Sequence, residues 1–220
     1  ISENGLFVFG GDATDRGSGD IRFTKALISL KERHPKQVVL LQGNRDVVKL
    51  RFGSELHPDE PAGTGDKHWD YKYETYLKDK SLDSNRISCC KWILCTMGCE
   101  SERGRTNTFE ARREELGLLG RANDDESVAE SFYQSVNPDG DDPWMLKFLQ
   151  LSDILFTIGD CLFVHAGITQ LSIGEVDLEQ VHMYPGMDKG AVPSPGMPGG
   201  APAPPGAAVA GSDVDAWARQ

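Results

Sequence analysis

The first fifty residues contain two short apolar runs with an amphipathic segment between them. The runs GLFVFG at 5–10 and QVVLL at 37–41 are each followed by glycine and a polar residue, a pattern typical of buried strands. Residues 20–33 space apolar side chains among Lys and Glu, with Asp at the start and Pro35 just beyond the end. This order predicts a strand–helix–strand unit with parallel strands. A right-handed crossover places both strand ends at the same edge of the sheet.

Helical patterns dominate the middle of the chain. Residues 53–68 are rich in Gly, Pro, Asp and His and predict a loop. From about 69 to 151 no strong strand pattern occurs, so we expect a helical insertion spanning about 53–151 between sheet elements. The predicted helical segments are WDYKYETYLKDK, NRISCCKWILCTM, NTFEARREELGLLG, DDESVAESFYQSV and PWMLKFLQLS.

The last part of the chain predicts a hairpin and then an unstructured segment. The runs DILFTIGD and CLFVHAGI flank Gly159-Asp160, which predicts two strands joined by a tight turn. Residues 184–211 are rich in Pro, Gly and Ala and cannot bury enough apolar surface to order themselves, so we expect a disordered loop. Residues 212–220 would begin a helix that the sequence cuts off. Residues 1–183 would then form one domain.

Composition and charge narrow the class of protein. The chain has 220 residues, 39% of them hydrophobic, and a net charge of -11. Clustered Lys and Arg hold nucleic-acid backbones, so this acidic chain predicts no nucleic-acid partner. No apolar run approaches the roughly 20 residues of a membrane helix, so no membrane association is expected.

The cysteine content and the first residues of the chain provide information on the cellular compartment of the protein. Five cysteines, four of them crowded between 89 and 99, do not resemble a secreted disulfide framework. They favour reduced thiols and a cytoplasmic location. The first residue is Ile and a strand follows within five residues, so we expect the natural N-terminus upstream, and N-terminal targeting cannot be read from this sequence.

Three predicted strand ends carry side chains that bind metals. Asp12 follows the first strand, and one carboxylate can bridge two divalent ions. Asn44 follows the second strand, and its amide oxygen is a weak but usable ligand for a hard divalent ion. His165 ends the last strand, and imidazole is a common ligand of transition metals. Each also has an ordinary alternative, as a turn acid, a turn amide or a packed histidine. Their combination at three strand ends favours a metal site.

The stretch GGDATDRG adds two further candidates beside Asp12. Arg16 offers a planar fork of donors that matches phosphate oxygens, and Asp15 could orient a neighbouring donor. Glycines at 10, 11 and 17 leave room for a ligand to approach the backbone. The alternative is a strand-to-helix turn with helix-capping acids, since turns favour Gly and Asp in any case.

Taken in order, GDxxDRG, GN followed by an arginine and an acid, and VHxG resemble the motifs of the calcineurin-like metallophosphoesterases, most closely the phosphoprotein-phosphatase branch. The resemblance covers residues 5–51 and 153–170. It implies an α/β fold, here an incomplete metallophosphoesterase β-sandwich with flanking helices and a helical insertion. It also implies two divalent metal ions, Mn, Fe or Zn.

The resemblance assigns a role to each candidate residue. Asp12 would bridge both metals, while Asn44 and His165 would bind the second. Asp15 would orient the catalytic acid, and Arg16 would grip the phosphate. The implied function is a phosphoesterase that hydrolyses phosphate esters with water activated by the two metals. Its partner would be a phosphorylated substrate, either a protein or a small molecule.

Two departures from the family pattern qualify these roles. The family's Asp-x-His motif, on a strand before this one, and its late Gly-His are absent, so the metal site is incomplete in this chain. We therefore expect a partial sequence that is inactive by itself. Arg45 occupies the position of the family's proton-donating His, and arginine stays charged and cannot be that acid, although it can stabilise phosphate charge. The alternative function is a catalytically weak or inactive phosphate-binding regulatory homologue.

Overall fold

The computed structural model describes residues 1–3, 5–15, 17–65, 69–99 and 107–167. Contacts divide the chain into two units. The first unit contains Ile1–Thr157 and Leu162–Ala166, and the described residues of the second are Ile158–Cys161 and Gly167. The predicted disordered loop at 184–211 and helix start at 212–220 lie outside the described residues.

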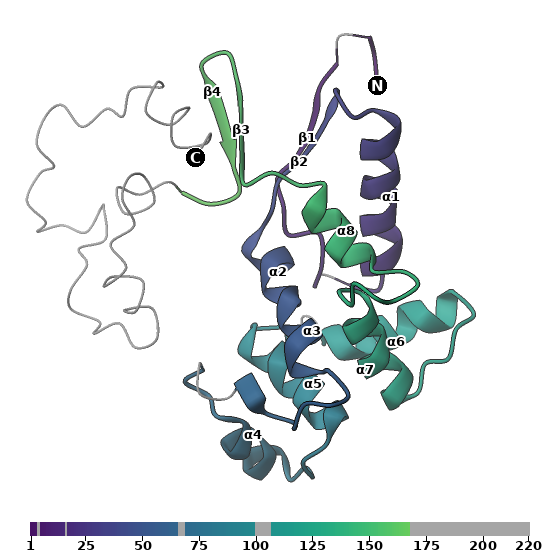
Figure 1. Ribbon diagram of the computed structural model, residues 1–220, viewed down its shortest axis with the longest axis vertical. Helices are drawn as coiled ribbons and strands as arrows, with labels where there is room; N and C mark the ends of the chain where they lie inside the picture. The colour runs from purple at the N-terminus through teal and green to yellow at the C-terminus, as the bar shows by residue number, and fades with distance from the viewer. Residues whose placement is uncertain (4, 16, 66–68, 100–106, 168–220) are drawn as a thin grey trace, which may run out of the picture. The chain divides into compact units, whose positions relative to one another are not determined.

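The predicted strand–helix–strand unit is confirmed (Figure 1). Strand β1 (Phe7–Phe9) pairs in parallel with β2 (Val38–Leu40), with Phe7 opposite Val38. Helix α1 (Asp20–Arg33) connects them and packs against α8 (Trp144–Gln150). Both strand ends therefore lie at one edge of this small sheet.

Three short helical turns follow β2 in immediate succession. They are α2 (Asn44–Val47), the 3₁₀ turn η1 (Val48–Leu50) and α3 (Arg51–Glu55). The loop predicted from residue 53 is wrong at its start, since 53–55 are helical. Glycine and Ser in that stretch obscured the pattern, but Phe52 is completely buried and holds this turn in the core.

The helical middle of the chain is confirmed, and its helices begin where local capping rules place them. The helices are α4 (Tyr73–Lys80), α5 (Arg86–Thr96), α6 (Thr108–Leu118) and α7 (Asp125–Gln134). The side chains of Asn85, Asn107 and Asp124 accept a backbone N–H three residues on, satisfying a donor at each helix start. Helix α5 contacts α3, α4, α6 and α7, which explains why it is apolar on most sides.

Aromatic side chains fill the core of this helical part. The rings of Phe52 and Phe132 lie 5.0 Å apart, and Phe109 stacks 6.4 Å from Phe132. The five cysteines all lie in the described ranges, and none of them forms a disulfide there. Cys95 and Cys99, although four residues apart, do not lie on one helix face, because α5 ends at Thr96 and the chain turns through Gly98 at φ +68°.

Strands β3 (Leu155–Ile158) and β4 (Cys161–Val164) form the predicted hairpin, with Gly159 at φ +55° in its turn. Just before β3, Asp153 pairs in parallel with Leu41, directly after β2. The described residues thus form a mixed α/β structure that is mostly helical, with two two-stranded sheets and no β-sandwich among them. The predicted sandwich is not seen because each sheet pairs only two strands in the part described.

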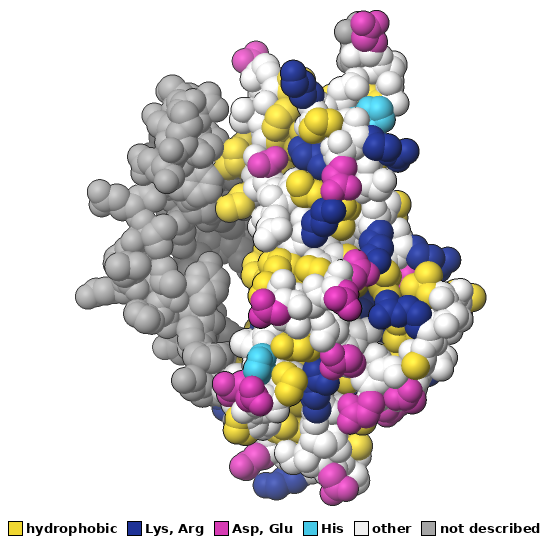
Figure 2. Space-filling view, turned by 45° about the vertical axis from the view of Figure 1, so that its right-hand side comes forward, with side chains coloured by type: hydrophobic (Ala, Val, Ile, Leu, Met, Phe, Trp, Pro, Cys, Tyr) yellow, Lys and Arg dark blue, Asp and Glu magenta, His cyan; other side chains and the backbone are white. Residues whose placement is uncertain are grey.

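None of the helices in the described ranges has the length and apolar character needed to cross a bilayer. On the face shown in Figure 2, acidic and basic side chains are mixed with scattered apolar ones.

Candidate functional site

The structure brings together the three side chains predicted as metal ligands. His165 Nε2 lies 3.3 Å from Asn44 Oδ1 and 3.3 Å from Asp12 Oδ1. Asp12 comes from the end of β1, Asn44 from the start of α2 after β2, and His165 from the residue after β4. All three belong to the first unit of the chain.

The orientation of the His165 ring determines which nitrogen faces the other two side chains. Its Nδ1 lies 2.6 Å from the carbonyl oxygen of Gly10. A carbonyl oxygen only accepts, so Nδ1 carries a hydrogen and donates it. In a neutral ring Nε2 is then an acceptor, and it faces the oxygens of Asn44 and Asp12, which are acceptors as well. Three acceptor atoms directed at one another need a hydrogen or a cation between them, supplied by a metal ion, by a proton on Nε2, or by the NH₂ group of Asn44 once its amide is turned over.

Two glycines permit this close approach. A Cβ atom on Gly11, whose φ is +89°, would lie 2.6 Å from Gly43 N and 2.8 Å from His165 Nδ1. A Cβ atom on Gly43 would lie 2.3 Å from Asp12 Oδ1 and 2.4 Å from Asp12 N. Side chains at either position would force the three segments apart.

Asp46 holds the ends of β1 and β2 together, a role that the sequence interpretation missed. Its carboxylate, which is completely buried, accepts N–H groups from Asp12 (2.8 Å), Ala13 (2.9 Å) and Gly43 (2.9 Å). Burial raises its pKa, while the three backbone donors act in the opposite direction. Its position three residues after Gly43, where an acid caps a helix start, is the signal that could have identified it.

Asp15 is connected through Arg45 to the three residues predicted as metal ligands, which are called the candidate trio below. It is buried, has φ +75°, and its carboxylate pairs with the equally buried ammonium group of Lys49. Arg45 Nη1 lies 3.5 Å from the same Asp15 oxygen. Lys49 was not predicted, since a lysine in a short helical segment gives no sequence signal of burial.

Arg45 lies between the two acids of the GGDATDRG stretch. Its Nε is 3.8 Å from Asp12 Oδ2, its backbone N–H donates to Asp12 Oδ1 at 3.1 Å, and its Nη1 is 3.4 Å from Cys99 Sγ. Burial raises the pKa of the Cys99 thiol to about 12, so Cys99 stays neutral beside it. A fixed positive charge therefore adjoins the trio. Arg16, the predicted phosphate-binding residue, lies outside the described residues.

The donor set can be tested against a metal ion. Ligands bonded at about 2.0–2.2 Å to one ion lie about 3 Å from each other, which the 3.3 Å separations approach. Carboxylate, amide and imidazole suit borderline or hard divalent ions such as Mn²⁺. Among the described residues, no group of three or more His, Cys, Asp and Glu side chains is arranged to hold a metal. The two separations measured from His165, to an amide oxygen and to a carboxylate oxygen, are close to those of ligands that share one ion.

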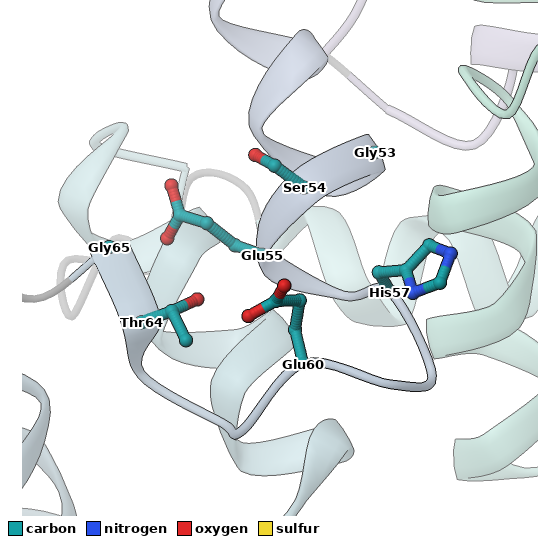
Figure 3. Close-up of a pocket in the computed structure, with 7 residues that line it drawn as sticks. All are labelled: Gly53, Ser54, Glu55, His57, Glu60, Thr64 and Gly65. Carbon is teal, nitrogen blue, oxygen red and sulfur yellow. The ribbon is translucent and has the colours of Figure 1, made fainter.

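A pocket of about 560 Å³ lies elsewhere, between α3 and the loop that follows it (Figure 3). The side chains of Glu55, Glu60 and Thr64 reach into it. The Glu55 carboxylate is already held by Arg51, at 2.6 and 3.0 Å. The lining contains none of the predicted site residues, so we assign no chemistry to this pocket.

No protein-family model, curated protein or solved structure matches this chain. Its function must therefore be argued from the geometry of its own residues and from the motifs that they form.

Proposed function

We propose that this chain carries the metal-binding edge of a metal-dependent phosphoesterase. The observation that carries the proposal is the convergence of three acceptor atoms, from Asp12, Asn44 and His165, with the histidine tautomer fixed by Gly10. A metal ion bound between the three atoms would remove the repulsion among them.

In this proposal each of the three residues has a ligand role. Asp12, Asn44 and His165 would hold a divalent ion, and the second oxygen of Asp12, now 3.8 Å from Arg45 Nε, would serve a neighbouring ion. Divalent ions bound here supply Lewis acidity that activates water and neutralises phosphoryl charge. Gly10 keeps the His165 ring oriented, and Asp46 keeps the Asp12 and Asn44 backbones adjacent.

Arg45 supplies fixed positive charge for phosphate oxygens, together with Arg16. Asp15 and Asp12 restrain its guanidinium group, at 3.5 and 3.8 Å. Because neither Arg45 nor the Cys99 thiol protonates a leaving group near neutral pH, the favoured substrates are phosphoanhydrides or aryl phosphates, whose leaving groups need little protonation.

The β-sandwich of the metallophosphoesterases belongs to this proposal. The β1–β2 pair and the β3–β4 hairpin would be parts of its sheets, and α4 to α7 would be an insertion. The proposed ions are Mn, Fe or Zn, the substrate is a phosphorylated protein or small molecule, and the setting is the cytoplasm.

A second candidate function is phosphate binding without turnover, in a regulatory homologue. Arg45 favours it, because a permanently charged side chain stands where a proton donor is needed. Both functions use the same ions and the same arginines, so only a rate measurement distinguishes them.

The test measures steady-state rates of hydrolysis of aryl and alkyl phosphates in the presence of Mn²⁺. It uses a chain that also carries the Asp-x-His and Gly-His segments. We expect aryl phosphate turnover, lost in Asp12→Asn. Arg45→His should improve alkyl more than aryl hydrolysis, because it adds a proton donor. Phosphate binding without turnover would support the regulatory homologue. Full activity in Asp12→Asn would refute the site.

A further inference from the structure

Helix α6, far from the site in sequence, makes direct contacts with the segment that carries Asp15. Its Glu115 is completely buried and accepts the backbone N–H groups of Ile21 and Arg22, both at 3.0 Å. These are first-turn donors of α1, whose N-cap is Gly19 and offers no side-chain acceptor. Glu115 therefore caps α1 from 94 residues away.

Arg112, one helical turn before Glu115, supports the first residue of the same helix. Its Nη2 lies 3.8 Å from Asp20 Oδ2. Its guanidinium carbon lies 4.3 Å from the ring centre of Phe132 and 5.2 Å from that of Trp144, so the group is held in place by aromatic faces. Arg112 is buried, so its charge is not screened by solvent.

Asp20 connects Arg112 to the candidate site through a hydrogen bond to Asp15. Its carboxylate accepts the backbone N–H of Asp15, at 3.2 and 3.3 Å. Asp15 has a left-handed backbone, which is unfavourable for a residue with a side chain and persists only where neighbours restrain it. The Asp15 carboxylate in turn pairs with Lys49 and Arg45, and Arg45 lies beside the candidate trio.

We propose that Glu115 and Arg112 are positioning residues for the candidate site, and that α6 fixes the conformation of residues 12–15 and 17–20. This gives the helical insertion a role that its sequence pattern does not suggest. The contacts form a continuous path of buried polar groups from α6 to Arg45, and its effect on metal binding rests on the proposed function.

The test uses the 220-residue chain and two conservative variants of α6. Glu115→Gln keeps the shape but removes the charge, and Arg112→Met keeps the apolar stem but removes the partner of Asp20. Arg113→Ala is the matched control, since Arg113 is the next residue and pairs instead with Glu110 and Asp125. Circular dichroism first verifies that each variant is folded.

The first readout is amide hydrogen exchange by NMR. We expect Glu115→Gln to speed exchange at Ile21 and Arg22 about tenfold, and Arg112→Met to do so at Asp15, because each loses a charged acceptor or its support. Arg112→Lys should restore most of the protection at Asp15. Arg113→Ala should change none of these amides.

The second readout is Mn²⁺ affinity by calorimetry, expected to fall about threefold or more in both variants and not in the control. If the wild type binds Mn²⁺ but the Asp15, Ile21 and Arg22 amides do not respond to either variant, the positioning role is wrong and the metal site stands. If those amides respond but the wild type does not bind Mn²⁺, the proposed function is wrong and the positioning role stands. Responding amides with unchanged Mn²⁺ affinity would overturn the link from α6 to the metal site.

Discussion

The edge of the β1–β2 sheet and the helical part from α4 to α7 are stabilised in different ways. The helical part buries aromatic rings such as Phe109 and Phe132 and begins its helices at ordinary caps. The sheet edge buries charges, with Asp15, Asp46 and Lys49 each almost fully removed from solvent, and the two buried charged residues of α6 contact the adjoining start of α1. Apolar packing stabilises a fold by itself, whereas buried charges require specific partners. The sheet edge therefore depends more on specific polar partners than the helical part does.

Backbone conformation separates the same two regions. Asp12 at φ +58° and Asp15 at φ +75° are non-glycine residues in the left-handed region, and both lie at the sheet edge. In the helical part the described non-glycine residue with positive φ is Ser81, which ends α4. A left-handed helix end is routine, but two such acids three positions apart place local backbone strain at the sheet edge.

The substitution expected to change the free energy of unfolding most lies in the helical part. Replacing Phe132 by Ala should lower the free energy of unfolding by about 3–5 kcal/mol, because it removes the ring that packs between Phe52 and Phe109. Urea denaturation followed by circular dichroism measures it. Leu118→Ala, at a side chain that is 63% exposed, is the control and should cost under about 1 kcal/mol. Equal losses in the two variants would contradict the packing account.

The second effect concerns the buried charges and depends on pH. Burial raises the pKa of Asp20 to about 6, so the folded protein binds a proton more tightly than the unfolded chain. The stability contributed by this group is therefore present at low pH and falls as pH rises from about 4 to about 6. Relative to Asp20→Asn, wild type should lose about 2–3 kcal/mol of unfolding free energy between pH 4 and 7.

Urea denaturation of both proteins at several pH values measures this difference. Subtracting the Asn variant cancels the other titrating groups that both chains share. A difference that rises with pH would show that Asp20 is stabilised in its charged form, and that Arg112 outweighs the cost of its burial.

A third, smaller effect tests the close approach at the sheet edge. Gly43→Ala should cost about 1–3 kcal/mol in unfolding free energy, because its Cβ would lie 2.4 Å from the Asp12 backbone nitrogen. Gly10→Ala is the matched control, since nothing lies within 4 Å of a Cβ atom there. Thermal unfolding of both variants measures the effect. Similar shifts in melting temperature would argue against close packing of Gly43 on the Asp12 backbone.

The sequence predicted the helical part and the strand–helix–strand unit well because both follow local rules. Residues 20–33 have the helical spacing and the end signals that the structure bears out, and Gly159 begins the hairpin turn as expected. The roles of Asp46, Lys49 and Glu115 were beyond the sequence. Each depends on contacts between residues 33 to 94 positions apart, and no local pattern encodes such pairings.

The positions of Asp12 and Asn44 after two parallel strands gave a physical reason to expect their side chains close together. Parallel strands joined by a helix share an edge, so polar residues after β1 and β2 must lie near one another. His165 was added to them by its motif alone, and the Leu41–Asp153 pairing explains its approach, because it attaches the start of the β3–β4 hairpin beside β2.

The most direct test of the metal site is calorimetric titration of the 220-residue chain with Mn²⁺ at pH 7. The wild type should bind, and both His165→Ala and Asp12→Asn should weaken binding more than about tenfold, because each removes a ligand. His34→Ala, a change at a half-buried histidine that follows α1, should leave the affinity unchanged. No Mn²⁺ binding by the wild type, or equal binding by all four proteins, would contradict the account.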